Sequence, residues 1–191
     1  MAPIYTIPQY LLDRTQIHDT VTRMLYQVDT RAFSALSTHV FTRTLTTDYT
    51  AMFGGEPSVG PSSNTIGSWE GIMGSKDVTQ HVVTGLLIDL AQPQGSEGEA
   101  EAVGEEEEEE VSIPSTAKVS ANVLVNIIKK GAEGGERTNN GGRYELEMQR
   151  LGRGEVKALT GRGNGNPWRV SLLRAVPLWQ AGNTAILGAS F

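Results

Sequence analysis

The stretch AKVSANVLVNIIK, residues 117–129, alternates apolar with mostly polar side chains along its whole length. A period of two residues is typical of a β-strand that buries one face. We therefore predict a long strand here, with its apolar row facing the core. That row comprises Ala117, Val119, Ala121, Val123, Val125 and Ile127.

Segments on both sides of this stretch show a similar alternation. It predicts further strands near residues 41–50, 79–90, 143–151 and 168–176. In the second of these, one face is predicted to carry His81, Val83, Gly85, Leu87 and Asp89. Pieces rich in Gly and Asn separate the later strands and are predicted to be long hairpin loops, at residues 131–142 and 152–167.

The N-terminal part of the chain has the periodicity of helices. Apolar residues recur at steps of three and four between residues 15 and 28, which predicts a helix with one buried face, and a shorter helix follows Asp29. Helices first and antiparallel strands afterwards favour an α+β fold. We expect a curved antiparallel or mixed sheet that wraps around the N-terminal helices and leaves an inner pocket.

Length and composition restrict the class of protein. The chain has 191 residues, which suits a single domain spanning residues 1–191, and it has no cysteine. Disulfides, thiolate nucleophiles and cysteine-ligated metal sites are therefore excluded. Residues 1–10 do not resemble a signal peptide and no apolar run reaches the ~20 residues that span a bilayer, so we expect a cytoplasmic protein without a membrane partner.

The net charge of −6 is concentrated in one segment. Nine of the 22 acidic residues are glutamates between residues 97 and 110, which leaves 13 acidic against 16 basic side chains elsewhere. The rest of the chain is thus close to neutral and has no field that would attract nucleic acid. We predict that residues 92–115 form a disordered acidic loop inserted between two strands, either as a tolerated solvated insertion or as an acidic interaction segment.

The segment TQHVVTG, residues 79–85, contains one of the three histidines of the chain within a predicted strand. A strand histidine can be a hydrogen-bonded core residue, or it can face a pocket and exchange protons with a ligand. Asp29 has two interpretations as well, since an aspartate before TRAFSAL can also cap the following helix. His18 and His39 are expected at a surface or helix end without a special role.

Five segments, in this order, resemble a known family: VDTRAF, TLTTDY, TQHVVTG, GGRYELEMQR and PWRVSLLR. They are similar to the SnoaL-like and scytalone-dehydratase-like group of the nuclear-transport-factor cone-fold superfamily. The resemblance implies a catalytic pair of His81 and Asp29, with Tyr49 holding a water against the substrate carbonyl. It also places Glu145 and Arg143 at substrate-contacting positions of the fourth strand, although strand alternation favours the outer face for Glu145.

Other side chains complete the expected site. A flat or polycyclic substrate could be contacted by Tyr26, Met52, Phe53, Trp69 and Asn126, although aromatic and methionine side chains are more often plain core. The C-terminal tail, residues 180–191, could cover the pocket mouth or be loosely ordered. No histidine spacing suggests a metal site, and neither a nucleotide fingerprint nor a GxSxG motif is present.

The resemblance implies a lyase or isomerase of secondary metabolism. We expect a cofactor-independent dehydratase, isomerase or cyclase that acts on a hydrophobic carbonyl-containing small molecule, such as a polyketide or terpenoid intermediate. Homo-oligomers, dimers or trimers formed through the outer sheet face, are expected from the same resemblance. The alternative is a non-catalytic ligand-binding or dimerisation module with the same fold.

Overall fold

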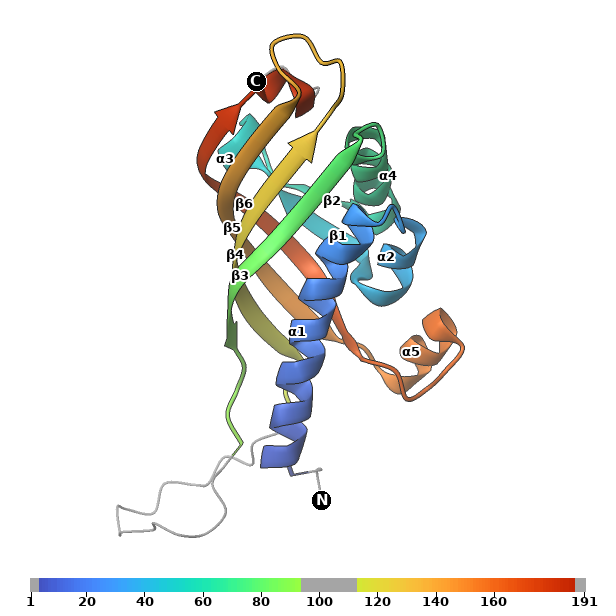
Figure 1. Ribbon diagram of the computed structural model, residues 1–191. Coiled ribbons are helices and arrows are strands. Elements are labelled where there is room, and N and C mark those ends of the chain that lie inside the picture. Colours follow the sequence, from blue (N-terminus) through green and yellow to red (C-terminus); the bar gives the residue numbers. More distant parts are fainter. Residues whose placement is uncertain (1–3, 94–112, 188–191) are drawn as a thin grey trace, which may run out of the picture.

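In the computed structural model, six strands form one curved sheet against a long N-terminal helix (Figure 1). The structure describes residues 4–93 and 113–187. The helices are α1 (Ile7–Asp29), α2 (Ser34–His39), α3 (Thr50–Phe53), α4 (Ser62–Met73), α5 (Arg153–Thr160) and a 3-10 turn at Thr184–Leu187. The strands are β1 (Phe41–Asp48), β2 (Ser58–Pro61), β3 (Val78–Asp89), β4 (Thr116–Ile128), β5 (Arg137–Arg150) and β6 (Trp168–Gly182).

The sheet is mixed, as expected. Its strand order is β2-β1-β6-β5-β4-β3, with β1 and β6 parallel and every other neighbouring pair antiparallel. The apolar row of β4 is buried from Ala117 to Ile127, which confirms the alternation read from the sequence. The predicted α+β cone, with the sheet wrapped around N-terminal helices, is therefore confirmed.

Helix α1 forms because its sequence supplies both a cap and a buried stripe. The Thr6 hydroxyl accepts a hydrogen bond from the Gln9 amide at 3.4 Å, and Pro8 fits the first turn, where no amide hydrogen is needed. The stripe packs into the core through Ile17, Val21, Met24, Leu25 and Val28. The helix ends at Asp29, and Arg31 then adopts a left-handed conformation with φ of 63°.

A β-bulge in β3 makes the inward face predicted for the second half of this strand wrong. In β3 the register against β4 shifts between Val83 and Gly85, which leaves Thr84 without a partner. Because one extra residue reverses every side chain beyond it, Leu86 and Ile88 turn inward, whereas Leu87 is 73% exposed. His81 and Val83 lie before the bulge and keep the predicted inward direction.

The predicted hairpin loops are shorter than expected. Strand β5 begins at Arg137, so the second half of the 131–142 loop pairs with β4 and β6 instead. The 152–167 loop contains helix α5, whose Val156 is buried. Helix α4 was also absent from the sequence prediction, because its glycines and polar residues obscure the helical period.

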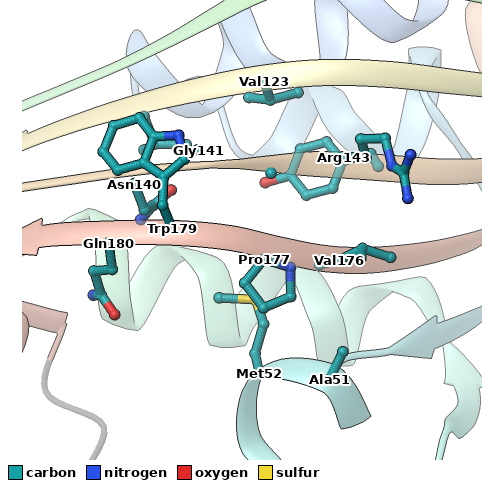
Figure 2. Close-up of a pocket in the computed structure, with 14 residues that line it drawn as sticks. Ala51, Met52, Val123, Asn140, Gly141, Arg143, Val176, Pro177, Trp179 and Gln180 are labelled. Atoms are coloured by element: carbon teal, nitrogen blue, oxygen red, sulfur yellow. The ribbon is translucent and has the colours of Figure 1, made fainter.

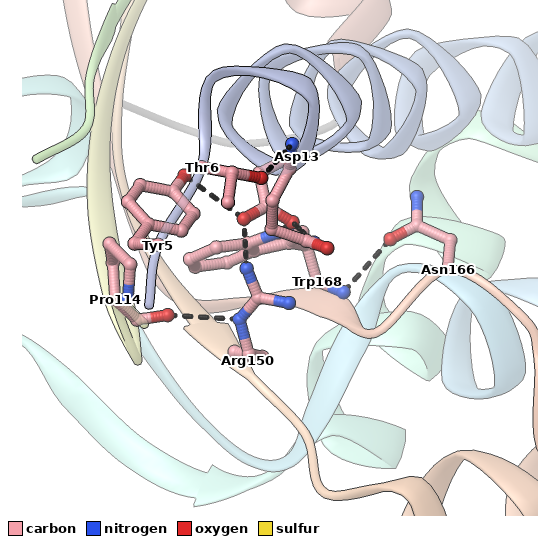
Figure 3. Close-up of polar contacts among 8 residues, drawn as sticks. Tyr5, Thr6, Asp13, Pro114, Arg150, Asn166 and Trp168 are labelled. Carbon is pink, nitrogen blue, oxygen red and sulfur yellow. Dashed lines mark hydrogen bonds and ion pairs between the residues drawn. The ribbon is translucent and has the colours of Figure 1, made fainter. Parts of the chain in front are cut away.

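A buried carboxylate joins α1 to β5 and β6 at the end of the fold away from α4 (Figures 1 and 3). Asp13, which has 0% exposure, accepts hydrogen bonds from the Tyr5 hydroxyl at 3.0 Å and the Trp168 indole at 3.2 Å. It also forms an ion pair with Arg150, whose guanidinium stacks over the Trp168 ring at 4.7 Å. The Nε–H of Arg150 donates to the Pro114 carbonyl at 2.9 Å.

The predicted acidic loop and the C-terminal tail lie partly outside the residues that the structure describes. Most of the acidic loop predicted at 92–115 lies outside the described residues, as do residues 188–191 of the tail. Residues 180–182 of that tail continue β6, and Ile186 and Leu187 are buried. Within the described ranges, no helix combines the length and apolarity needed to cross a membrane.

Candidate active site

Asp29 and His81 contact each other at two points. The Asp29 Oδ2 accepts a hydrogen bond from the His81 backbone amide at 2.7 Å, and Oδ1 lies 2.7 Å from the ring Nδ1. Both side chains are largely shielded, with exposed fractions of 18% and 4%. A carboxylate at Nδ1 favours the tautomer that carries its proton there, which leaves Nε2 as the ring atom able to accept a proton.

This geometry corrects the capping interpretation of Asp29. Helix α2 has Phe33 at its N-cap position and no side-chain cap. The Asp29 carboxylate instead reaches from the end of α1 to β3 and holds both the backbone and the ring of His81. The aspartate therefore positions a strand histidine.

Arg31 supports the pair from the same turn. Its guanidinium donates to the Val28 carbonyl at 3.0 Å, the Lys76 carbonyl at 3.0 Å and the Thr79 hydroxyl at 2.6 Å. These bonds offset the cost of its left-handed backbone, about 1 kcal/mol for a residue with a Cβ. They fasten the end of α1 to β3 two residues before His81.

His81 opens into a cavity of about 410 Å³. Its walls come from α1, α3, α4, strands β1 to β5 and the C-terminal 3-10 turn, and most of the lining side chains are apolar. Among them are Leu25, Val28, Met73, Ile127 and Leu187. A concave, mostly apolar site of this volume with a few polar groups is the usual form of a small-molecule site.

Two tyrosines line this cavity together with His81. The Tyr49 hydroxyl accepts a hydrogen bond from the Trp69 indole at 2.8 Å, so its own hydrogen is available to another acceptor. The Tyr144 hydroxyl has no hydrogen-bond partner among the described residues. Burial, and secondarily the charge of Asp29, raise the pKa of Tyr144 to about 12. Burial also raises the pKa of Tyr49, so both phenols keep their protons at neutral pH and can donate hydrogen bonds.

The tyrosine ionisations give a pH prediction. In the unfolded chain phenols ionise with their ordinary pKa of about 10, whereas the pKa of folded Tyr144 is raised to about 12. The unfolded state therefore releases protons that the native state retains, and stability conferred by this site is lost as pH rises from about 10 to 12. Absorbance titration at 295 nm should show delayed tyrosine ionisation in the native protein, and Tyr144→Phe should remove part of the delayed signal. Identical native and unfolded titration curves would contradict this.

A second cavity, of about 310 Å³, lies between α3 and the glycine-containing parts of β5 and β6 (Figure 2). Four residues line both cavities: Met52, Val125, Asn140 and Tyr144. The two cavities therefore adjoin. Trp179 lies beside Gly141 in the wall of the second one, and Met52 on α3 points toward Pro177 on β6 (Figure 2).

The predicted site residues fall into two groups. Met52, Phe53 and Trp69 line the His81 cavity together with Tyr49, and Arg143 lines only the second cavity. Four others line neither of the two cavities: Asp29, which contacts His81, and Tyr26, Asn126 and Glu145. Tyr26 is 67% exposed, and Glu145 forms an ion pair with Arg174 at 3.4 Å.

Glu145 faces outward, as strand alternation predicted, and not into the pocket, as the family resemblance implied. Tyr144 pairs with the buried residues Ala121 and Ala175 and faces inward, so Glu145 must face outward. If the family's strand is aligned with β5 one residue out of register, every inward position is assigned to the outward face. The sequence analysis did not single out Tyr144, because this residue belongs to the buried row with Leu146 and Met148. Its hydroxyl group could have identified it, since a buried tyrosine normally forms a hydrogen bond through that group.

The sequence from residue 9 to residue 174 matches the SnoaL-like domain. The chain belongs to this family. The family resemblance expected from sequence is therefore confirmed. None of the curated proteins is a significant match. Within the described residues of this SnoaL-like domain, no cluster of three or more His, Asp or Glu side chains could hold a metal ion.

Solved structures share the fold of this SnoaL-like domain at low sequence identity. The Kfla4162 protein of Kribbella flavida has a TM-score of 0.70 and 20% identity over 94% of this chain and 99% of its own. A proposed scytalone dehydratase from Novosphingobium aromaticivorans has a TM-score of 0.64 and 12% identity over 93% and 92%. An NTF2-like superfamily protein from Salmonella enterica has a TM-score of 0.59 and 10% identity over 92% and 97%. These similarities confirm the cone fold.

Proposed function

We propose that this SnoaL-like domain is a cofactor-independent acid/base enzyme, a lyase or isomerase in which His81 is the base and Asp29 its partner. The observation that carries the proposal is the double contact of Asp29 with His81 at the wall of an apolar cavity. A core histidine pairs both ring nitrogens within the protein, whereas a base needs one nitrogen held by a partner and ligand space at the other. His81 has both.

The first step is removal of a proton from a carbon next to a carbonyl group. The Nε2 atom of His81 accepts that proton, and the C–H electron pair moves toward the carbonyl to form an enolate. Asp29 stabilises the resulting imidazolium. The Tyr49 hydroxyl, its oxygen already held by the Trp69 indole, donates a hydrogen bond to the enolate oxygen.

The second step decides the product. If the enolate carries a β-hydroxyl group, that group leaves as water with the proton held by His81, and a conjugated double bond forms. If the proton returns to another carbon, the product is an isomer. The residues of the site can perform either reaction, and the bound substrate determines which one occurs.

The lining supports a hydrophobic carbonyl-containing substrate, such as a polyketide- or terpenoid-type intermediate. Apolar walls favour a molecule with little charge, and neutral phenols favour a carbonyl acceptor. The similarity to a proposed scytalone dehydratase agrees with a lyase reaction. The self-associating dimer or trimer expected from sequence stays a prediction.

Tyr49→Phe tests the phenol at the enolate oxygen. Loss of one donor to a developing oxyanion is expected to lower kcat by about 10²-fold with a small change in KM, because the hydrogen bond strengthens as negative charge forms. Tyr26→Phe is the matched control, since that phenol is exposed and lines neither cavity. An equal effect of the two changes would contradict the role of Tyr49.

The experiment for the function as a whole is turnover of a panel of β-hydroxy ketones and enones, with aromatic and terpenoid skeletons, by the wild-type protein without added metal or nucleotide. Formation of water and a conjugated ketone would identify a dehydratase, and a shifted double bond would identify an isomerase. Binding of these compounds without any turnover would favour the non-catalytic binding module.

A further inference from the structure

We infer that the substrate is elongated, with its reactive carbonyl end beside His81 and an apolar alkyl or aryl arm in the second cavity next to α3. This inference rests on the proposed function, because it extends the same site. It depends on how the second cavity is built, how it meets the first, and which side chains line it.

Two consecutive glycines of β5, Gly141 and Gly142, allow β6 to approach closely in the wall of the second cavity. A Cβ at Gly141 would lie 2.4 Å from the Trp179 indole nitrogen, and one at Gly142 would lie 2.5 Å from the Val176 carbonyl oxygen. Only glycine allows these close approaches. The pairing of β5 with β6 also shifts register between the two glycines. The two glycines and the register shift therefore place Trp179 and the β6 backbone directly against β5, and together these groups form this wall of the second cavity.

The junction between the cavities contains unpaired polar groups. Asn140 and Tyr144 line both cavities, and neither side chain has a hydrogen-bond partner among the described residues. Partly buried polar groups without partners are uncommon unless water or a ligand satisfies them. A molecule that passes from one cavity to the other would contact both.

Beyond the junction the lining is mainly apolar. Val123, Ala175, Pro177 and Trp179 contribute hydrocarbon and indole surface, and Met52 on α3 adds an adaptable side chain. Each methylene group that moves from water into such a space tightens binding by roughly threefold to fourfold. An arm of several carbons is therefore expected to raise the affinity stepwise with its length.

The test is the binding of a series of straight-chain phenyl ketones, from acetophenone to decanophenone, measured by isothermal titration calorimetry. The wild-type protein should bind longer ketones more tightly until the second cavity is full. Ala51→Phe should abolish the gain of the longer members and leave acetophenone unaffected, because Ala51 is exposed on α3 and lines only the second cavity. Val176→Phe narrows the same space from β6 and should have the same effect.

The matched control is Ala158→Phe, an identical change at an exposed residue of α5 that lines neither cavity. In this variant, binding affinity should increase with ketone chain length as it does in the wild-type protein. The inference is overturned if Ala51→Phe and Ala158→Phe show the same dependence, if the wild-type affinity does not vary with length, or if no ketone binds.

His81→Ala separates this inference from the proposed function. The variant should retain the dependence of affinity on arm length, since His81 does not line the second cavity. Length-dependent binding with no turnover of any β-hydroxy ketone would remove the proposed function and leave the arm site standing. Turnover that requires His81, with an affinity that does not vary with arm length, would support the proposed function and contradict the arm site.

Discussion

His81→Ala is expected to lower kcat by about 10³-fold on any ketone that the wild-type protein converts. The variant removes the proton acceptor and leaves the rest of the cavity in place, so KM should change far less. Asp29→Asn keeps the size of the side chain but removes the charge that stabilises the imidazolium, and about 10²-fold loss is expected. Steady-state kinetics with circular dichroism of each variant measure the effect and check the fold.

A variant with both His81→Ala and Asp29→Asn tests whether the two residues act as a pair. Because Asp29 acts through His81, adding Asp29→Asn to the His81→Ala protein should cost little more than His81→Ala alone. His18→Ala is the matched control, since His18 is exposed on α1 and lines neither cavity. Losses that multiply in the double variant, or an equal loss in His18→Ala, would contradict the pairing.

Asp13→Ala is expected to reduce the free energy of unfolding by about 3–5 kcal/mol. The change leaves the Arg150 guanidinium without its counter-charge and the Tyr5 and Trp168 donors without their acceptor, in a part of the fold where Asp13 is fully buried (Figure 3). Urea unfolding followed by tryptophan fluorescence measures the difference in the free energy of unfolding.

Asp19→Ala provides the comparison for this prediction. Asp19 lies on the same helix and is exposed, and its carboxylate lies 3.9 Å from the His18 ring. Its replacement should change the free energy of unfolding by less than about 0.5 kcal/mol. The proposed importance of the Asp13 network fails if Asp13→Ala costs no more than Asp19→Ala.

Much of the fold follows from local sequence patterns. The strict alternation of β4 and the three- and four-residue steps of α1 each reflect one buried face, so they identified the two central elements. The bulge at Thr84 could not be anticipated, because the apolar residues around it continue on both faces and conceal the reversal. Helix α5 was read as loop because its many glycine neighbours and single buried residue, Val156, give little periodicity.

The site was predictable only in part. The pairing of Asp29 with His81 joins residues 52 positions apart and came from the family resemblance, since either residue alone has an ordinary structural explanation. Glu145 was placed inward by the same resemblance, but its neighbour Tyr144 occupies that face. The second cavity depends on Gly141 and Gly142 lying against β6, a tertiary approach that a glycine pair in a sequence does not reveal.

The measurement that tests the central claim most directly is solvent deuterium exchange at the carbon next to the carbonyl of a bound ketone, followed by proton NMR in D₂O. It reports proton abstraction itself, whether or not water later leaves. We predict that the wild-type protein accelerates exchange and that His81→Ala abolishes the acceleration while still binding the ketone. Acceleration that survives in His81→Ala, or a wild-type protein that binds the ketones without exchanging them, would contradict acid/base catalysis by His81.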